Sequence, residues 1–500
     1  MTRPAAEIGR GLAPARAARA IRRGERIHVL GAAGAGASAA VLLAHRAGAA
    51  VSGCDPGGPS PYTAALAAAG LPIAWEHSAA HVEAASDQRP DRLAVTKALT
   101  AVEPDHPELA AARALDIPAE AWQQLVADVA ATTGQTLLAV AGTHGKSTTC
   151  GWLVDLLVRA GRDPSAFVGA LLDSALTGGT PSTARSGSGD LFVVEADEYA
   201  GNFDPYHPAV IVLLNAEWDH PDVFADEEAV LAAFEAWIRR APGATLIANL
   251  GDPGVARIVE RLRGWNGNVV TFCLDGAADV PAVVFTQDGR SHLALIGPHV
   301  SSPGVQDVVE VGLSGPANAA NALAVIAAAQ VLGVDDARVR ESLAEFGGVG
   351  RRMEVKGDVG GVVVLDDYAH HPTAIARTLD AVRLRYPGRR IWAVYEPLTY
   401  HRTALMLGSF GDVLSTADAV AIADIWPGRD PDTTVTSAQA LADEVNHRGR
   451  TRADATGTVE QTADYLAERV RPGDVVLVMG GGRSYVVADR LVELLSRRGR

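Results

Sequence analysis

One local pattern recurs along the chain, and it restricts the fold more than any other feature of the sequence. An apolar, β-branched run leads into a turn rich in glycine or acidic residues, and the turn leads into a stretch rich in Ala and Leu. Such alternation of strand, loop and helix is typical of α/β folds built on mostly parallel sheets. The pattern predicts strands over Arg26–Leu30, Leu137–Ala141, Leu191–Glu195, Val210–Asn215, Val362–Asp366, Ile391–Tyr395, Ala419–Ala423 and Asp474–Met479.

The length and two breaks in this pattern predict three consecutive domains. A chain of 500 residues is expected to hold several domains of roughly 100–200 residues each. Residues 126–134 lead from one strand–loop–helix unit into another, and residues 346–352 form a glycine-rich break. The polar, Gly- and Ser-rich residues 177–190 are expected to form a surface loop. We therefore expect a leader over residues 1–24 and domains over residues 25–133, 134–347 and 348–500.

Charge and cysteine content exclude several classes of protein. The 59 acidic and 44 basic residues leave a formal charge of −15, which disfavours general binding to nucleic-acid phosphates. No apolar run reaches the ~18 residues that a membrane-spanning helix needs. Cys54, Cys150 and Cys273 lie too far apart in sequence for a disulfide framework or a CxxC metal site, which fits a reducing compartment. We expect a cytoplasmic protein, monomeric or homodimeric, without nucleic-acid partners or membrane insertion.

The strongest motif joins the run 137–141 to a helical stretch through a loop that resembles a phosphate-binding loop. Glycines let backbone N–H groups close on phosphate oxygens, and the helix N-terminus adds the positive end of its dipole. Lys146 would neutralise the phosphates, and the Ser147 hydroxyl would bind Mg²⁺. The alternative is an ordinary strand–turn–helix corner with an incidental Gly-Lys-Ser. The motif predicts ATP binding by Gly142, Thr143, His144, Gly145, Lys146, Ser147 and Thr148.

Two further apolar runs end in polar residues suited to metal binding. The run 191–195 leads into Glu-Ala-Asp-Glu, residues 195–198, and Glu195 is the first acid of this group. A carboxylate presented in this way beside a phosphate loop is a typical Mg²⁺ ligand. The run 210–215 leads into a polar cluster that contains His220, which we expect to contact a metal or phosphate. The alternatives are a solvated strand end for the acids and a structural role for the histidine.

Together, these motifs resemble the Mur ligase family, the ATP-dependent amide-bond ligases of peptidoglycan synthesis. The resemblance covers the chain from about residue 25 to the C-terminus and rests on motifs in the family's order: GTHGKST at 142–148, EADE at 195–198, NAEWDH at 215–220, GVGRR at 348–352 and DDYAHHPT at 366–373. It implies a Rossmann-like UDP-binding domain, a P-loop ATPase central domain with a parallel sheet, and a Rossmann-like C-terminal domain that binds the amino acid.

The resemblance also implies roles for individual residues. The glycine-rich loop after the first strand looks like the family's uridine-nucleotide loop, although alone it equally suggests NAD. It implies UDP-sugar contacts by Gly31, Gly34, Gly36, Ser38 and Asp55. The resemblance implies ATP contacts by Asn318, Asn321 and Asp367, amino-acid contacts by His370 and Arg402, and stabilisation of the transferring group by Arg351 or Arg352. The implied catalytic set is Lys146, Glu195, His220, Arg351 and Arg352, with Ser147, Glu195 and His220 on the metal.

The implied reaction joins an amino acid to the lactyl carboxylate of UDP-N-acetylmuramate, with ATP as co-substrate and Mg²⁺ as cofactor. Several family branches use a carbamylated lysine in the central domain, but no lysine lies between Lys146 and Lys356 here. This leaves the branches that add L-alanine or a ready-made tripeptide, of which we favour L-alanine. Glu396 and Leu398 stand where the family has Gln and His, and Arg483 also departs from its motif. A P-loop kinase and a non-catalytic UDP-sugar- and ATP-binding regulator are the alternatives from other classes.

Overall fold

A computed structural model describes residues 3–287, 290–296, 307–428, 430 and 432–498. It contains three sheets and divides into two compact units. The first unit holds most of the chain up to Val349, and the second holds Gly350 onward with two short segments of the central region. Parallel strand pairs predominate in the three sheets, which confirms the predicted α/β class. The predicted boundary at residue 348 lies two residues before Gly350, while the one at residue 134 lies inside the first unit.

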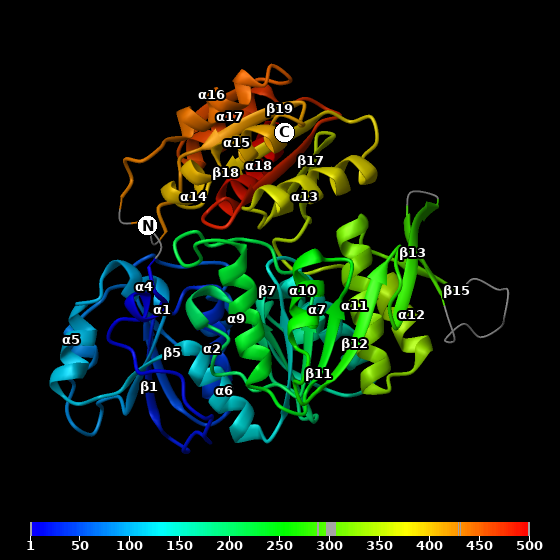
Figure 1. Ribbon diagram of the computed structural model, residues 1–500. Helices are drawn as coiled ribbons and strands as arrows, with labels where there is room; N and C mark the ends of the chain where they lie inside the picture. The colour runs from blue at the N-terminus through cyan, green and yellow to red at the C-terminus, as the bar shows by residue number, and fades with distance from the viewer. Residues whose placement is uncertain (1–2, 288–289, 297–306, 429, 431, 499–500) are drawn as a thin grey trace. The chain divides into compact units, whose positions relative to one another are not determined.

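The first sheet has five parallel strands and lies in the first unit. Its helices α2 and α6 cover one face and α5 covers the other, as Figure 1 shows at the blue end of the chain. The strand order is β3 (Ile73–Ala74), β2 (Ala50–Cys54), β1 (Arg26–Leu30), β4 (Arg92–Val95) and β5 (Ala119–Ala121). The helices are α1 (Ala5–Ile8), α2 (Ala35–Arg46), α3 (Ala64–Ala68), η1 (Ala79–His81), α4 (Lys97–Val102), α5 (Pro107–Ala114) and α6 (Trp122–Thr133).

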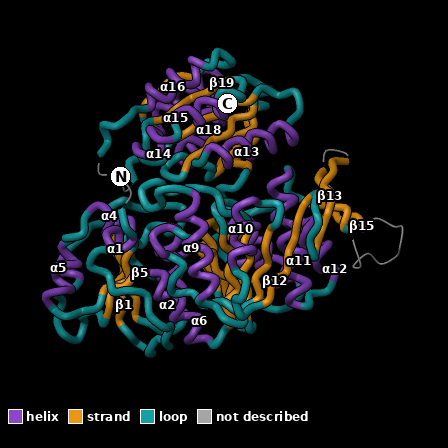
Figure 2. The backbone as a smooth tube through the Cα atoms, in the orientation of Figure 1, coloured by secondary structure: helices purple, strands orange, loops and turns teal. Residues whose placement is uncertain are grey.

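The second sheet is the largest, with ten strands, and its central strands are parallel. Helices α9 and α10 cover one face (Figure 2), and α7 packs against β7 and β9. The strand order is β15 (Asp307–Val311), β14 (Arg290–Leu295), β13 (Val280–Gln287), β12 (Asn268–Leu274), β11 (Thr245–Asn249), β10 (Val210–Leu213), β6 (Thr136–Ala141), β9 (Leu191–Ala196), β7 (Ser165–Leu172) and β8 (Ser182–Arg185). The helices are α7 (Lys146–Arg159), α8 (Ser174–Thr177), η2 (Tyr199–Gly201), α9 (Glu227–Arg239), α10 (Pro253–Arg261), α11 (Pro316–Leu332) and α12 (Asp336–Glu345).

The third sheet, in the second unit, has six strands, of which the edge strand β16 is antiparallel to β17. Buried apolar side chains of α17 and α18 pack on one face of this sheet. The strand order is β16 (Glu354–Val359), β17 (Val362–Asp367), β21 (Val475–Gly480), β18 (Ile391–Glu396), β19 (Ala419–Ala423) and β20 (Ala453–Gly457). The helices are α13 (Pro372–Arg385), α14 (Tyr400–Leu405), α15 (Leu407–Leu414), α16 (Ala438–His447), α17 (Val459–Arg469) and α18 (Tyr485–Arg498).

The expected surface loop over residues 177–190 is wrong in part, because this segment contains β8. β8 pairs antiparallel with β7 and contacts α2 of the first sheet, and its residues Ser182, Thr183 and Ala184 are buried. The Thr183 hydroxyl lies 3.3 Å from the Ser38 hydroxyl, and the Ser182 hydroxyl accepts a hydrogen bond from the Ala184 N–H, so these two buried hydroxyls have partners inside the unit. The composition of the segment does not distinguish a loop from an edge strand, because Ser and Thr occur both in loops and in tightly packed edge strands.

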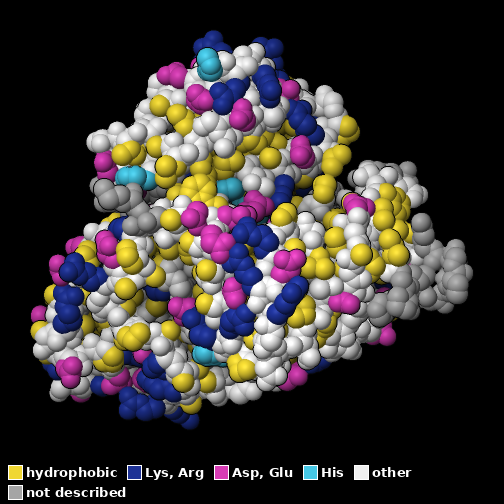
Figure 3. Space-filling view, in the orientation of Figure 1, with side chains coloured by type: hydrophobic (Ala, Val, Ile, Leu, Met, Phe, Trp, Pro, Cys, Tyr) yellow, Lys and Arg dark blue, Asp and Glu magenta, His cyan; other side chains and the backbone are white. Residues whose placement is uncertain are grey.

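The surface of the first unit mixes charges of both signs. In the space-filling view, basic and acidic side chains lie next to one another over α9 and α10 (Figure 3), where Arg257 and Arg261 pair with Glu227 and Glu228. Such a face does not attract a phosphate backbone in the way a uniformly basic patch does. None of the helices in the described ranges has both the length and the apolar character needed to cross a membrane.

A buried ionic network joins the ends of the first domain. The Arg92 guanidinium lies 2.6 Å from Asp128, 2.8 Å from Glu120 and 3.1 Å from Glu25, and its side chain is 3% exposed. Burial alone would raise the pKa of Glu25, but hydrogen bonds from Arg19 and the Arg22 backbone, together with the charge of Arg92, lower it to about 2. Its contribution to stability is therefore present above its unfolded pKa and is lost only as the pH falls toward 2.

We expect Arg92→Leu to reduce the free energy of unfolding by about 3 kcal/mol, because the variant removes the buried cation shared by Glu25, Glu120 and Asp128 and leaves them only the partly exposed Arg16 and Arg19. Hydrogen exchange of the β4 and α6 amides measures the change in this part of the molecule. The control is Arg22→Leu, since the Arg22 side chain is 71% exposed and its ion pair with Glu25 is 4.0 Å long. If the two variants exchange alike, the network does not stabilise the fold.

Candidate active site

The loop between β6 and α7 has the backbone of a phosphate-binding turn. Gly142 and Gly145 have φ of +137° and +83°, which side-chain-bearing residues rarely adopt. A Cβ on Gly145 would lie 2.6 Å from the Asn321 side-chain oxygen, and one on Gly142 would lie 3.0 Å from the Asn215 backbone. Glycine is therefore required at both positions, and the loop leads directly into the N-terminus of α7.

The segment after β10 holds this loop in place. The Asn215 side chain accepts a hydrogen bond from the His144 backbone N–H at 2.7 Å and donates to the His144 carbonyl at 3.0 Å. The Thr143 hydroxyl donates to the Glu217 carbonyl at 3.0 Å and accepts from the Glu217 N–H at 2.9 Å. Asn215 and Glu217 thus shape the loop, a role the sequence analysis did not assign to them, although both stand in the polar run that it singled out.

Lys146 lies at the centre of the site among carboxylates. Its Nζ donates to the Gly142 carbonyl at 2.5 Å and to Glu198 at 3.0 Å, and it lies 3.6 Å from Asp197. Burial opposes the charge of this lysine, but Glu198, Asp197 and Glu195 raise the pKa of Lys146 above its ordinary value. Burial raises the pKa of Glu198, and the positive charge of Lys146 opposes this rise. Lys146 is therefore a fixed cation, oriented toward the loop that would hold the phosphates.

Two groups of oxygen-rich donors flank Lys146. Glu195 accepts a hydrogen bond from the Ser147 hydroxyl at 3.1 Å and from the Gly169 N–H at 2.7 Å. Metal-binding atoms of Asp197, Glu198 and His220 lie within 4.8 Å of one another, and His220 Nε2 is 3.8 Å from Glu198. Carboxylate and hydroxyl oxygens are the donors that Mg²⁺ prefers, so these residues fit that ion.

The sequence pattern indicated Glu195, but not Asp197 and Glu198, as a site residue. β9 runs through Ala196, so Glu195 is still inside the strand and its side chain lies on the side of Ser147. Asp197 and Glu198 are the acids that follow the strand, and they lie beside Lys146. The predicted strand ended at Glu195, whereas β9 includes Ala196 as well. Because side chains alternate between the two faces of a sheet, this extra residue decides which acids lie beside Lys146.

The glycine-rich loop of the first domain brings three of its predicted residues together. Gly31 has φ of +79°, and a Cβ there would lie 2.5 Å from the Thr96 side chain. Asp55 accepts a hydrogen bond from the Ala33 N–H at 3.0 Å, so it organises the turn that leads through Gly34 into α2.

The remaining two predicted residues of this loop, Gly36 and Ser38, make packing contacts. A Cβ on Gly36 would overlap the Trp122 ring at 2.2 Å. The buried Ser38 hydroxyl donates to the Ala35 carbonyl. Both contacts account for a small side chain in α2 without a ligand, and the predicted UDP-sugar contacts of the two residues stay predictions.

In the second unit, Arg351 and Arg352 have different surroundings. The Arg351 guanidinium is buried and bonds to Asp366 at 3.1 Å and to the Ser484 hydroxyl at 2.8 Å. Arg352 is half-buried, with its guanidinium 4.9 Å from the centre of the Tyr368 ring. Arg351 therefore holds β17 to the loop after β21, while Arg352 lies nearer to the surface.

The other predicted residues of the C-terminal region lie at the carboxyl ends of β17 and β18. Asp367 accepts hydrogen bonds from the Met353 and Ala369 N–H groups at 2.8 Å each, and its pKa is raised by burial. His370 Nδ1 lies 2.9 Å from the Tyr368 carbonyl oxygen, and Arg402 is buried in α14.

The two predicted asparagines of α11 differ in their surroundings. Asn321 lies beside Gly145, whereas Asn318 donates to the Ser314 carbonyl at 3.0 Å.

Comparison with known proteins decides the family. Three family models match consecutive parts of the chain: the Mur ligase family catalytic domain over residues 26–133, the Mur ligase middle domain over 140–329 and the Mur ligase glutamate ligase domain over 351–482. A UDP-N-acetylmuramate–L-alanine ligase from Kineococcus radiotolerans is 38% identical over 95% of this chain and 97% of its own length. The chain belongs to the Mur ligase family. The predicted resemblance and three-domain architecture are thereby confirmed.

Solved structures of Mur ligases share the fold along nearly the whole chain. The UDP-N-acetylmuramate–alanine ligase of Thermotoga maritima superposes with a TM-score of 0.78 at 25% identity, covering 95% of this chain and 99% of the other. A murein peptide ligase from Psychrobacter arcticus gives a TM-score of 0.72, also at 25% identity and with the same two coverages. This member of the Mur ligase family is therefore an ATP-dependent ligase by family.

Glu396 provides a pH-dependent test of the second unit. Burial raises the pKa of Glu396 to about 7, although the Ser484 backbone and Arg351 oppose this. A carboxyl whose pKa is higher in the folded than in the unfolded state favours the fold in its protonated form. This contribution to stability is fully present below about pH 4.5 and is lost as the pH rises through 7. Glu396→Gln, which restores the family's residue, should therefore stabilise this unit at pH 8 by up to about 3 kcal/mol and much less at pH 5. Hydrogen exchange of the β18 and β21 amides at both pH values measures this, and an equal effect at the two would contradict it.

Proposed function

We propose that this Mur ligase joins L-alanine to the lactyl carboxylate of UDP-N-acetylmuramate. The observation that carries the proposal is the similarity to a relative of that name over 95% of the chain. A carboxylate oxygen attacks the γ-phosphorus of ATP and ADP leaves, which gives an acyl phosphate. The amine of L-alanine then attacks the acyl carbon, phosphate leaves, and the nitrogen loses a proton. The products are the amide, ADP and phosphate.

In this proposal the loop 142–148 and Lys146 bind and orient the phosphates of ATP. The site supplies charge neutralisation and alignment rather than covalent chemistry. Ser147 and Glu195 would hold one Mg²⁺ and Asp197, Glu198 and His220 a second, and the metal would neutralise charge on the phosphates. Asp197 and Glu198 also hold the ammonium group of Lys146 against the loop.

We assign the remaining contacts to residues at strand ends and helix starts. Of the two neighbouring arginines, Arg352 is the better candidate for the transferring phosphoryl group, because Arg351 is buried beside Asp366 and Ser484, whereas Arg352 is half-buried. Asn318, Asn321 and Asp367 are proposed to contact the ATP nucleotide. Gly31, Gly34 and Asp55 are proposed to contact the uridine nucleotide. His370 and Arg402 are proposed to contact the amino acid.

The choice of L-alanine over a tripeptide as the amine donor rests on the L-alanine ligase relative, whose similarity extends through the second unit. Leu398 forms a parallel bridge with Trp426, and the Thr399 N–H donates to the Trp426 carbonyl at 2.9 Å. A Cβ on Gly481 would lie 3.1 Å from Leu398, and one on Gly482 would lie 2.6 Å from Trp426. These contacts hold the segments around Leu398 and Trp426 against the turn after β21. The murein peptide ligase of similar fold keeps the tripeptide as the second candidate.

The cell compartment follows from the substrates in this proposal. A reaction that consumes ATP and a UDP-sugar requires the compartment in which both nucleotides are made, so we propose the cytoplasm. The three cysteines are buried and free, which agrees with a reducing environment.

An ADP-release screen with UDP-N-acetylmuramate and different amines tests the function. We expect ADP release to be fastest with L-alanine, slower with glycine or L-serine, and slowest with the tripeptide. Mass spectrometry of the product identifies the amide. A preference for the tripeptide would favour the second candidate. ADP release with a stable phosphorylated product would indicate a kinase, and no ADP release with any amine would indicate a regulator.

We expect Lys146→Met to lower kcat at least about a hundredfold, because the variant removes a buried cation beside the phosphates. Binding of UDP-N-acetylmuramate, measured by calorimetry, should be unchanged, since that nucleotide is assigned to the first domain. The control is Lys356→Met, a partly exposed lysine on β16 that pairs with Asp489 at 2.9 Å. Near-normal turnover of folded Lys146→Met would remove this loop from the reaction.

A further inference from the structure

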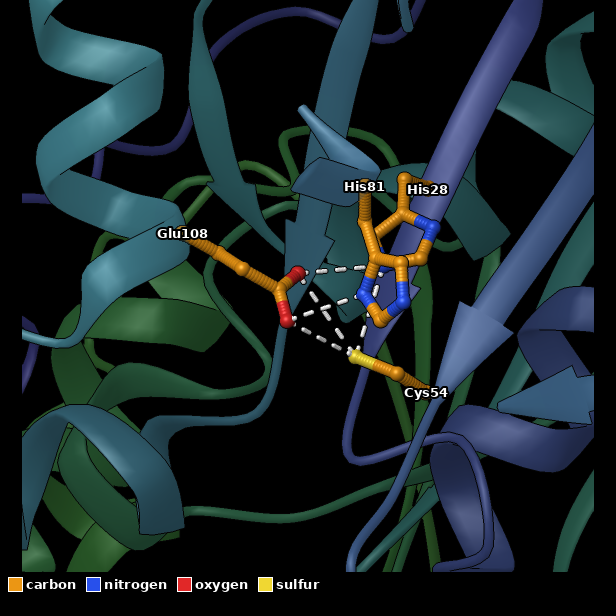
Figure 4. A group of neighbouring side chains, drawn as sticks. All are labelled: His28, Cys54, His81 and Glu108. Atoms are coloured by element: carbon orange, nitrogen blue, oxygen red, sulfur yellow. Dashed lines mark hydrogen bonds and ion pairs between the residues drawn. The ribbon is translucent and has the colours of Figure 1, made fainter. Parts of the chain in front are cut away.

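A group of metal-binding side chains lies in the first domain, apart from the ATP loop. His28 comes from β1, Cys54 from the end of β2, His81 from the end of η1 and Glu108 from the first turn of α5 (Figure 4). The side chains point toward one another on the face of the sheet that α5 covers. His28, Cys54 and Glu108 are at most 3% exposed, and the His81 side chain is 21% exposed. We call these four residues the His-Cys-Glu cluster.

Four distances between donor atoms of the cluster are close to those between the ligands of a tetrahedral zinc site, and all the donor atoms lie within 4.8 Å of one another. His28 Nε2 lies 3.4 Å from Cys54 Sγ and 3.1 Å from Glu108 Oε2, and Cys54 Sγ lies 3.3 Å from Glu108 Oε1. His81 Nδ1 lies 3.2 Å from Glu108 Oε1. Zinc bonds of ~2.0–2.3 Å place neighbouring tetrahedral ligands about 3.3–3.6 Å apart. The cluster is therefore close to the size of a zinc coordination sphere.

The charges of the cluster also favour a cation. Glu108 is fully buried, and among the described residues its ion-pair partners are the imidazoles of His28, His77 and His81, with no Lys or Arg. A buried carboxylate surrounded by imidazoles and a thiol is stabilised far better by a divalent ion than by neutral rings. Imidazole, thiolate and carboxylate together are a typical donor set for zinc.

Neighbouring groups already orient the ligands. The Ser52 hydroxyl lies 2.8 Å from His28 Nδ1, which leaves His28 Nε2 facing the cluster. The Ser78 N–H donates to Glu108 at 3.0 Å, and the Glu108 N–H donates to His106 Nδ1 at the start of α5. Metal-binding histidines commonly bond through their second ring nitrogen in this way, which fixes the ring for the metal.

We propose that His28, Cys54, His81 and Glu108 bind one Zn²⁺ as a structural site. On binding, the Cys54 thiol releases its proton to solvent, and the thiolate becomes a ligand. Four protein ligands would close the coordination sphere, as in structural rather than catalytic zinc sites. The metal would tie β1, β2, η1 and α5 together on one face of the sheet. This site is independent of the proposed ligase reaction.

Metal titration of the purified full-length chain tests the site. After removal of bound metal, Co²⁺ is added in the presence of excess Mg²⁺, which occupies the oxygen-rich sites beside Lys146. We expect one Co²⁺ per chain with a thiolate charge-transfer band and the intense visible bands of tetrahedral cobalt, and displacement of both by Zn²⁺. Zn²⁺ should also raise the Tm, and a chelator should reverse the rise.

Matched variants identify the ligands. Cys54→Ser should abolish the charge-transfer band, and His81→Asn should weaken Zn²⁺ binding by more than about a hundredfold, beyond the effect of indirect contacts. The controls are Cys273→Ser, which removes another buried thiol, and His45→Asn, which removes an exposed histidine of α2. Both should bind Zn²⁺ like the parent chain.

Three outcomes would overturn the proposal. They are no charge-transfer band in the parent chain, a band that survives in Cys54→Ser, and a band lost equally in Cys273→Ser. His77 is the close competitor of His81, since its Nδ1 lies 3.2 Å from Cys54 Sγ. Loss of Zn²⁺ in His77→Asn but not in His81→Asn would show that the assigned ligand set is wrong. Because His81 lies at the edge of the cluster, His81→Asn keeps the test decisive should Cys54→Ser fail to fold.

Discussion

Three neighbouring parallel strands end at the same level of the central sheet, and the proposed ATP chemistry depends on this alignment. β6 lies between β9 and β10, and Ala141 is in register with both Ala196 and Leu213. The residues that follow each strand are therefore brought together, although they are up to about eighty positions apart in sequence. The loop after β6, the acids after β9 and the polar run after β10 are brought together in this way.

The charges at this edge explain why metal ions belong to the proposed reaction. Glu195, Asp197 and Glu198 surround the cationic side chain of Lys146, so acidic groups outnumber the lysine they surround. A triphosphate would be repelled by such a site unless divalent cations lay between the phosphates and the carboxylates. The same carboxylates keep Lys146 charged and hold it against the loop. In the proposed reaction, acidic residues thus serve both the lysine and the metal.

Neighbouring residues with the same chemistry have separate tasks in this fold. Arg351 is used within its own unit, where it bonds to Asp366 and Ser484, and Arg352 is left nearer to the surface. Gly31 permits a turn, while Gly36 permits the Trp122 ring to pack on α2. In the first domain, polar side chains that would be expensive to bury singly are buried as the His-Cys-Glu cluster. Residue type alone does not distinguish these tasks.

The sequence by itself determined the class of fold, the strand that leads into each motif and the family. Predicted strands such as Arg26–Leu30 and Ala419–Ala423 coincide with β1 and β19, because a mostly apolar run suits a strand buried in a parallel sheet. Only the tertiary structure decided which acid lies beside Lys146, that β8 interrupts an expected loop, and that His28, Cys54, His81 and Glu108 meet. These outcomes depend on which face a side chain occupies and on contacts between residues distant in sequence, and a local pattern carries information about neither.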